Sequence, residues 1–354
     1  MRYADLPDVQ EILPGISSRA QELDQSGDWP ETDLHVLASL DAMRWGVPLL
    51  SGGEGLAAIE LHFRYEALAS SSVAVALILS QRDSAVDLID GATDWLKRDE
   101  TLHQLSLNEI WTTVGIAQLT TSRQGAQPAL RATPTSAGYR IDGVIPWATG
   151  AGKSDLVVAG AALPDGRQIL FALPTHLPGV RVEPPLPLVS LRASWTSQIT
   201  CTGVELSSDW VMRGPADKAL VGRRKSLALG QAFLGMGLAC GAINLIGEHT
   251  SPLAKTAYDR FDHQLISLRR EVLDLCDPAR EAEAMREAPR LRGAINDLVL
   301  RITHTGVALY KGSGLLSDHP AQRLAREAMF LLVWSCPGSV IECTVDRLTE
   351  DCPA

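Results

Sequence analysis

Residues 146–158 read PWATGAGKSDLVV. A proline, a tryptophan and a threonine lead into a turn of small residues, after which an apolar run begins. Short runs of this kind, bounded by glycine-rich turns, are typical of β-strands. The stretch therefore predicts two strands joined by a turn, and it places Trp147 and Thr149 at the end of the first strand.

Similar runs lie on both sides of this turn. They are rich in Val, Ile and Thr and are separated by Gly, Pro and Asp turns; they cover residues 110–121, 138–148, 154–163, 167–174, 179–188 and 196–206. Such spacing indicates a compact all-β unit. We predict a β-barrel-like middle domain over residues 111–213.

Helical periodicity flanks the β unit. Before it, residues 33–50, 54–72 and 84–105 place apolar side chains three and four positions apart, which predicts a helical N-terminal domain over 1–110. After it, four helices are expected at about 220–248, 256–276, 286–311 and 319–345, with a charged, exposed connection at 276–289. The predicted fold is thus α+β and multidomain, ending in a four-helix bundle over residues 214–354.

Composition limits the classes of partner. The 354 residues carry 32 Lys and Arg against 42 Asp and Glu, a net charge of −10 that disfavours nucleic acid and anionic membranes. The six cysteines form no C-x-x-C pair, so neither a zinc site nor a disulfide framework is indicated. The acidic N-terminal stretch lacks the features of a signal peptide, and we expect a cytoplasmic protein.

One stretch has the length and the apolar composition of a membrane-spanning helix. Residues 226–247 carry no charge over a length that could cross a bilayer. Five glycines and the polar residues Ser226, Gln231 and Asn244 interrupt it. A helix that is apolar all round can also be the central helix of a bundle, where small residues permit close packing. We predict a buried helix and no membrane span.

The order of helices, strands and helices resembles the acyl-CoA dehydrogenase family over nearly the whole chain. Residues 142–158 resemble the family's flavin-binding strand, and residues 177–212 resemble the segment in which an R-x-S-x-T stretch precedes a strand. The resemblance implies FAD as cofactor, with Trp147 near the isoalloxazine ring and Thr149 hydrogen-bonded to its reactive edge. Without the resemblance, the same two residues could simply close a β-sandwich beside a turn.

Further cofactor contacts are implied by the same resemblance. Residues 118–125 occupy the place of the family's V-T-E motif, so Thr120, Thr121 and Ser122 fall on its three positions, with Ser122 replacing the acid. The family's glycine motif in the C-terminal part is reduced to GSG, in which Gly312 is retained.

Two arginines are candidate substrate ligands. Arg192 belongs to the R-x-S-x-T stretch with Ser194 and Thr196, and Arg224 precedes the long apolar helix. Either guanidinium could bind a carboxylate or a phosphate. Either could equally form an ion pair between domains.

The chain departs from the family at the catalytic base. Placing Arg326–Ala328 on the family's R-D-A segment puts Ser335 at the position of the usual glutamate, and the alternative base position falls on Arg223. Removing the proton next to a thioester carbonyl requires a positioned base. Neither position carries an acid, so the catalytic base remains unassigned. The flavin monooxygenase branch also lacks the glutamate, but its histidine would fall near Trp334 and is absent here.

Three functions remain open. The first is an FAD-dependent oxidoreductase that acts on an acyl thioester or related small molecule and passes electrons to an acceptor. The second is a flavin-dependent monooxygenase or oxidase that uses oxygen. The third is an inactive relative that serves as a subunit or binding protein. In each case we expect a homodimer or homotetramer that assembles through the C-terminal bundle.

Overall fold

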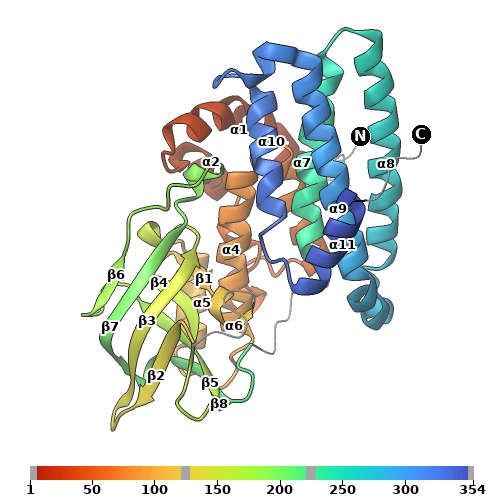
Figure 1. Ribbon diagram of the computed structural model, residues 1–354. Coiled ribbons are helices and arrows are strands. Elements are labelled where there is room, and N and C mark those ends of the chain that lie inside the picture. The colour runs from red at the N-terminus through yellow and green to blue at the C-terminus, as the bar shows by residue number, and fades with distance from the viewer. Residues whose placement is uncertain (1–5, 121–127, 221–228, 350–354) are drawn as a thin grey trace.

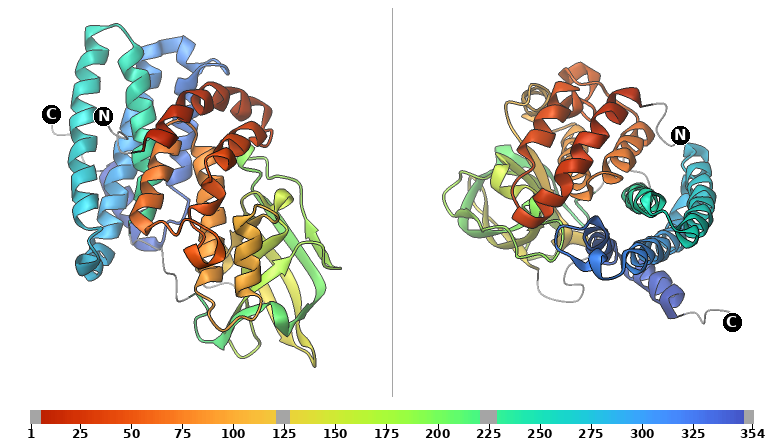
Figure 2. Two further views of the ribbon diagram at one scale, coloured as in Figure 1. Left: turned by 180° about the vertical axis from the view of Figure 1, so that it is seen from behind. Right: turned by 90° about the horizontal axis from the view of Figure 1, so that it is seen from above.

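The computed structural model describes residues 6–120, 128–220 and 229–349. Its elements form three parts: N-terminal helices, a β-sheet and C-terminal helices (Figure 1). The long helix α4 (Val73–Asp90) lies between the sheet and the C-terminal helices in the views of Figures 1 and 2. This helix therefore borders both of the other parts.

The N-terminal part is helical, as predicted. Besides α4 it contains α1 (Pro7–Ser26), α2 (Glu31–Ser39), α3 (Ala58–Ala69), α5 (Arg98–Ser106) and the 3-10 helices η1 (Ala42–Arg44) and η2 (Leu49–Ser51). The helix predicted over residues 33–50 is wrong beyond Ser39, because Asp41 adopts a left-handed backbone conformation and the chain continues in two short 3-10 turns. α4 begins at Val73, where the Ser72 hydroxyl accepts a hydrogen bond from the Val75 N–H.

One eight-stranded sheet forms the middle part. Its strands are β1 (Thr112–Gly115), β2 (Leu130–Pro134), β3 (Gly138–Ala148), β4 (Leu156–Ala162), β5 (Gln168–Pro174), β6 (Val180–Val182), β7 (Ser197–Ser207) and β8 (Val211–Ala216). They are ordered β6-β7-β3-β2-β4-β5-β8, and β1 pairs with β4 in parallel. The barrel-like sheet stays open, because β6 and β8 stand at the two ends of this order.

The first predicted strand is only partly correct. The run over residues 110–121 leaves the sheet after Gly115 and turns into the short helix α6 (Ala117–Thr120). The Gln118 amide donates hydrogen bonds to the carbonyls of Gly115 (2.9 Å) and Gly160 (3.0 Å). These bonds fix the turn against the sheet, a tertiary interaction that strand propensity does not encode.

Over the residues described, the C-terminal part contains three long helices and two shorter ones of 12 residues each. They are α7 (Gly230–Glu248), α8 (Pro252–Asp274), α9 (Glu281–Tyr310), α10 (Pro320–Leu331) and α11 (Gly338–Thr349), with the 3-10 helices η6 (Pro278–Arg280) and η7 (Lys311–Leu315) between them. The connection predicted over 276–289 is present only over residues 276–280, because the Ala, Glu and Met residues from Glu281 on are strong helix formers and begin α9. The last predicted helix is two helices, since Pro337 cannot donate a backbone hydrogen bond.

α7 is the buried centre of this bundle. Among the described residues it is the single helix long and apolar enough to cross a membrane, and 78% of its most apolar window is buried inside the protein. A Cβ atom on Gly237 would lie 2.3 Å from the Glu66 carbonyl oxygen of α3, and one on Gly241 would lie 2.4 Å from that of Ser70. The predicted role of the small residues in close packing is therefore confirmed.

Candidate functional site

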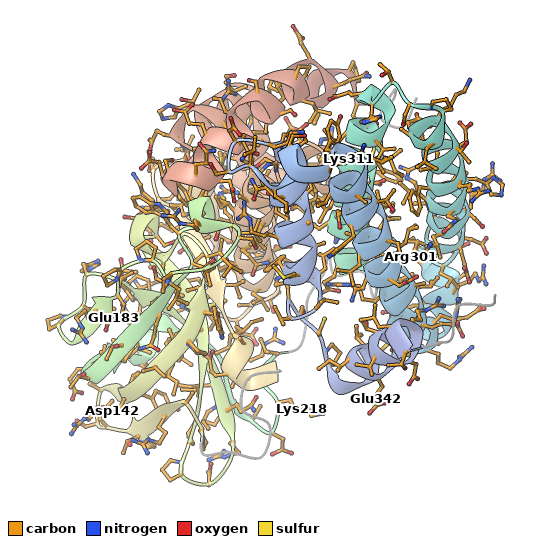
Figure 3. The ribbon with its side chains drawn as sticks, turned by 45° about the horizontal axis from the view of Figure 1, so that its top comes forward. Asp142, Glu183, Lys218, Arg301, Lys311 and Glu342 are labelled. Atoms are coloured by element: carbon orange, nitrogen blue, oxygen red, sulfur yellow. The ribbon has the colours of Figure 1, made fainter. Side chains whose placement is uncertain are left out.

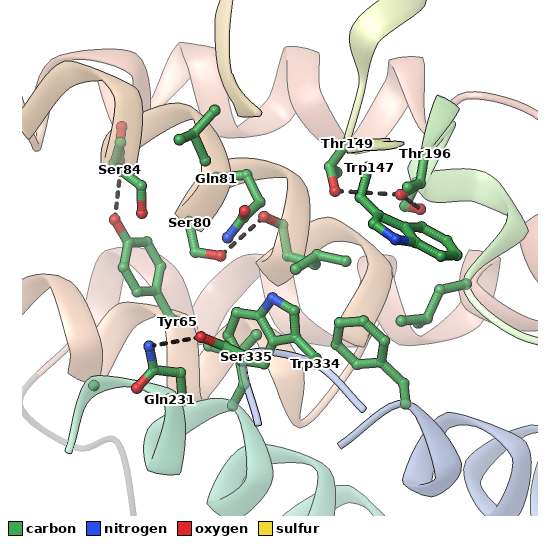
Figure 4. A pocket seen from close by; sticks show the side chains of 18 of the residues that line it. Tyr65, Ser80, Gln81, Ser84, Trp147, Thr149, Thr196, Gln231, Trp334 and Ser335 are labelled. Atoms are coloured by element: carbon green, nitrogen blue, oxygen red, sulfur yellow. Dashed lines mark hydrogen bonds between the residues drawn. The ribbon is translucent and has the colours of Figure 1, made fainter. Parts of the chain in front are cut away.

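A cavity of about 520 Å³ opens where the three parts meet. One wall comes from α3 and α4, a second from the end of β3 and the 3-10 helix η4 (Arg192–Ser194), and a third from α7, α10 and the residues after α10. Figure 4 shows these side chains converging on one space. Its volume lies within the range of small-molecule sites in proteins.

The β3 wall combines an aromatic ring with three hydroxyl groups. Trp147 lines the cavity and is 48% exposed. Behind it, the hydroxyls of Thr149 and Thr196 lie 3.2 Å apart, and those of Thr196 and Ser194 lie 2.8 Å apart (Figure 4 shows the first pair). Because all three hydroxyls are buried and border the cavity, they form a row of hydrogen-bonding groups along one of its walls.

Backbone contacts hold this row in place. The Gly150 N–H donates to the Ser194 carbonyl at 2.9 Å, which joins the end of β3 to η4. Leu191 and Trp195, on either side of η4, both adopt left-handed backbone conformations. The Trp195 indole also donates to the Gly27 carbonyl at 3.0 Å. The row is thus anchored to the N-terminal part as well as to the sheet.

The third wall ends at Ser335, the residue at the usual base position. Its backbone φ is +48°, and its hydroxyl accepts a hydrogen bond from the Gln231 amide of α7 at 3.5 Å. The neighbouring Trp334 ring stacks on Phe330, with 5.4 Å between ring centroids. The Gln231 amide can orient the serine but cannot accept its proton, so this pair does not form an activated nucleophile or a base.

Arg292 of α9 supports the turn that carries Ser335. Its buried guanidinium donates to the carbonyls of Trp334 (3.2 Å) and Leu331 (3.4 Å) and lies over the Trp334 ring. The Leu331 carbonyl is among those that the end of α10 leaves without helical partners, and the Trp334 carbonyl belongs to the turn that follows. Burial lowers the pKa of Arg292 to about 10, which still leaves the side chain charged at neutral pH.

The remaining wall carries buried ionisable groups. The Tyr65 hydroxyl of α3 donates to Asp83 of α4 at 2.6 Å, and Arg82 donates to the same carboxylate at 2.8 Å. Arg82 also donates to the carbonyls of Met43 (2.8 Å) and Leu105 (2.9 Å). Burial, followed by the charge of Asp83, raises the pKa of Tyr65 well above its usual value, so the phenol stays protonated.

Three of the predicted site residues meet at this cavity: Trp147, Thr149 and Ser335. Thr120 is the last residue of α6, while Thr121 and Ser122 lie outside the described residues. The cavity does reach Ile116 and Ala117, which precede these three residues in the sequence. Arg223 and Arg224 also lie outside the described residues.

Gly312 and Arg192 do not line the cavity. Gly312 is an exposed residue of η7, and Figure 3 labels its neighbour Lys311 at the end of the bundle opposite to Glu342 of α11. Arg192 points to the N-terminal part, where it donates to the Gln25 carbonyl at 2.9 Å. Its guanidinium thus joins two parts of the fold through a backbone carbonyl, where the alternative interpretation expected an ion pair, and its role as a substrate ligand stays a prediction.

The residues of α3 and α4 were not predicted as site residues. The cavity face of α4 carries Ser80, Gln81, Asp83, Ser84 and Asp87, and α3 adds His62 and Tyr65. A signal does exist in the sequence, because polar residues at three- and four-residue spacing interrupt an otherwise apolar helix. That pattern alone does not distinguish a cavity wall from a solvent-exposed face.

Comparison with known proteins agrees with the resemblance drawn from the sequence. No family model matches the chain. Cyclohex-1-ene-1-carbonyl-CoA dehydrogenase of Geobacter metallireducens is 20% identical over an alignment of 355 positions, which covers 94% of this chain and 93% of that protein. Butyryl-CoA dehydrogenase of Megasphaera elsdenii superimposes with a TM-score of 0.77 at 17% identity, over 98% of this chain and 99% of the other.

A monooxygenase shares the same architecture. Dibenzothiophene monooxygenase of Paenibacillus superimposes with a TM-score of 0.79 at 16% identity, over 97% of this chain and 96% of the other, and a structure of it contains FMN. The predicted resemblance to the acyl-CoA dehydrogenases is therefore confirmed along nearly the whole chain. The chain has their fold at low sequence identity.

Proposed function

We propose that this protein is a flavin-dependent oxidoreductase that binds FAD at the β3 wall of the cavity. The observation that carries the proposal is the arrangement of Trp147 beside the buried hydroxyls of Thr149, Thr196 and Ser194, all bordering one cavity. The resemblance to acyl-CoA dehydrogenases and the FMN found in a protein of the same fold support it.

The residues present fit a flavin ring. Isoalloxazine is flat, with one apolar end and a polar edge of nitrogen and oxygen atoms, and it supplies hydride or single-electron transfer when bound. Trp147 offers a broad apolar surface, and the hydroxyl row offers groups that can donate to the polar edge. In this proposal these residues hold and orient the ring, while Thr120, Thr121, Ser122 and Gly312 remain proposed contacts for the rest of the cofactor.

The substrate would occupy the remaining space, toward α4 and α7. We propose an acyl thioester or a related small molecule. The usual base position carries Ser335, which interacts with an amide rather than with a base. The carboxylates that border the cavity, Asp83 and Asp87, instead come from α4. Proton removal from a thioester would therefore need a different residue from the usual one.

The Ser335–Gln231 pair favours a second candidate function. A flavin monooxygenase or oxidase reaction with oxygen requires no carboxylate at position 335, and a monooxygenase shares this fold. In either reaction the electron acceptor, or oxygen, must reach the cavity. We further propose that the protein is a cytoplasmic homodimer or homotetramer that assembles through its C-terminal helices.

A visible absorption spectrum tests the proposal directly. Purified protein is titrated with FAD and with FMN, together with Thr149→Ala and the control Thr202→Ala on an exposed position of β7. We expect a bound-flavin spectrum, a roughly tenfold weaker affinity or a shifted spectrum for Thr149→Ala, and no change for Thr202→Ala. Unchanged affinity and spectrum in Thr149→Ala would contradict the assigned contact.

The same sample separates the candidate functions. Reduction of the flavin by acyl-CoA without oxygen supports the dehydrogenase reaction, and oxygen consumption by the reduced protein supports the second candidate. A colourless protein that binds neither flavin would overturn both. The protein would then serve as a subunit or binding protein.

A further inference from the structure

The walls of the cavity differ in chemistry. Around the proposed flavin position they are apolar and aromatic, with Trp147, Phe330 and Trp334. The α4 wall is polar beyond Leu77, where its cavity-lining residues are Ser80, Gln81, Asp83, Ser84 and Asp87. An alkyl chain would gain nothing from such a wall, because polar groups that lose water without a partner cost free energy.

The polar residues of α4 are confined to the half that meets the cavity. Its first seven residues, 73–79, are all apolar and buried. A helix surrounded by protein is normally apolar all round. Polar side chains in such a helix therefore need a partner in the protein, in water or in a ligand.

Two of these polar side chains have partners within the protein. The Ser80 hydroxyl donates to the Leu77 carbonyl at 2.9 Å, and Asp83 accepts from Tyr65 and Arg82. Gln81 and Ser84 differ: both are half-buried, both line the cavity, and neither side chain makes a hydrogen bond to another described residue. They lie one helical turn apart and so face the cavity side by side (Figure 4).

We propose that Gln81 and Ser84 recognise a substrate that carries a hydroxyl or carboxamide group at the end facing α4, in place of a plain alkyl chain. The amide of Gln81 and the hydroxyl of Ser84 each donate and accept hydrogen bonds, and a hydroxyl or carboxamide on the ligand does the same. The inference rests on the proposed function in taking this cavity as the substrate site. A site built to bind a hydroxyl group discriminates strongly against the analogue that lacks it.

Matched ligand pairs test this selectivity. The FAD-loaded protein is titrated with 4-hydroxybutyryl-CoA against butyryl-CoA, and with benzyl alcohol against toluene, and binding is followed by the change in flavin absorption. We expect the hydroxyl-bearing member of at least one pair to bind about tenfold more tightly. Gln81→Met and Ser84→Ala should each remove most of that preference. Gln104→Met, which changes a half-buried glutamine of α5 outside the cavity, should retain it.

Three results would overturn the inference: equal or tighter binding of the alkyl members, a preference that survives in Gln81→Met, or no binding by either pair. A structural role is tested separately. Because Gln81 has no hydrogen-bond partner among the described residues, Gln81→Met should keep the melting temperature of the wild type, and a drop of several degrees would contradict the proposal. If the protein binds no flavin, the proposed function fails, and ligand-induced shifts in melting temperature of the flavin-free protein test the selectivity independently.

Discussion

Tyr65 of α3 and Asp83 of α4 are joined by a buried hydrogen bond of 2.6 Å at the edge of the cavity. Arg82 binds the other oxygen of the carboxylate and is itself held by two backbone carbonyls. The phenol and the carboxylate thus fix the distance between two helices that form one wall of the site.

Tyr65→Phe should destabilise the protein by about 1–3 kcal/mol, because the buried carboxylate loses a donor that nothing replaces. The pKa of Tyr65 is raised in the folded state. The contribution of Tyr65 to stability is therefore complete below its pKa in the unfolded chain, near 10, and is lost as the pH rises through its pKa in the folded protein. The difference in free energy of unfolding between wild type and variant should thus be constant up to about pH 10 and shrink above it. Urea unfolding at several pH values measures this, and a difference that grows above pH 10 would contradict the assignment.

Glu66→Gln should weaken the contact between α8 and α3. Glu66 is almost fully buried and accepts from the Arg269 guanidinium at 3.0 and 3.3 Å, so removing the charge leaves the arginine without its partner. Breaking a buried pair in this way costs about 3 kcal/mol. The matched control is Asp297→Asn, whose partner Arg301 lies half-exposed on the outer face of α9 (Figure 3) and for which less than about 1 kcal/mol is expected. Equal losses of unfolding free energy in the two variants, measured by thermal unfolding, would show that burial of an ion pair does not determine the cost of breaking it.

Ser335→Glu should introduce the carboxylate that this cavity lacks at the usual base position. If a thioester binds beside the flavin, the variant gains flavin reduction by butyryl-CoA in the absence of oxygen, at least tenfold faster than the wild type. Ser335→Gln has the same size without the negative charge and should show no gain. A stopped-flow trace at the flavin absorption maximum distinguishes the two variants, and equal rates would show that position 335 is not near the reacting carbon.

Val345→Glu should weaken self-association. Ile341, Val345 and Leu348 of α11 are each about half exposed, at 48%, 49% and 51%, and they follow one another at helical spacing as an apolar stripe. Because Val340 and Thr344 on the same helix are buried, the stripe points away from the rest of the chain. Sedimentation should show a smaller species for Val345→Glu and an unchanged one for Asp346→Lys. A wild-type monomer would contradict the predicted assembly.

The strands and the β3 side of the site could be predicted because the residues that determine them are close together in the sequence. Trp147 and Thr149 end a strand whose alternation and following turn are explicit in the sequence, and the resemblance assigned them a shared role. Ser335 was placed by alignment alone, and its presence at the cavity depends on the break between α10 and α11. Pro337 lies at that break. The helical spacing of apolar residues continues past Pro337, so the spacing alone does not show where α10 ends.

The α4 wall and the direction of Arg192 could not be predicted, for a common reason. Whether a side chain on a given element faces a ligand, a neighbouring helix or water depends on contacts between residues far apart in sequence. Arg192 precedes Ser194 by two positions, yet one points to Gln25 and the other to the cavity. Likewise, the turn of the chain into α6 depends on Gln118 reaching Gly160 in another strand.

The cavity takes its walls from three parts of the chain. Tyr65, Thr149 and Ser335 come from separate parts of the fold, and each borders the same space. A ligand bound there contacts all three and stabilises the state in which they are assembled. Calorimetry should therefore record a higher transition temperature once the cavity is filled, so that the occupant itself acts as a cross-link between three parts of the chain.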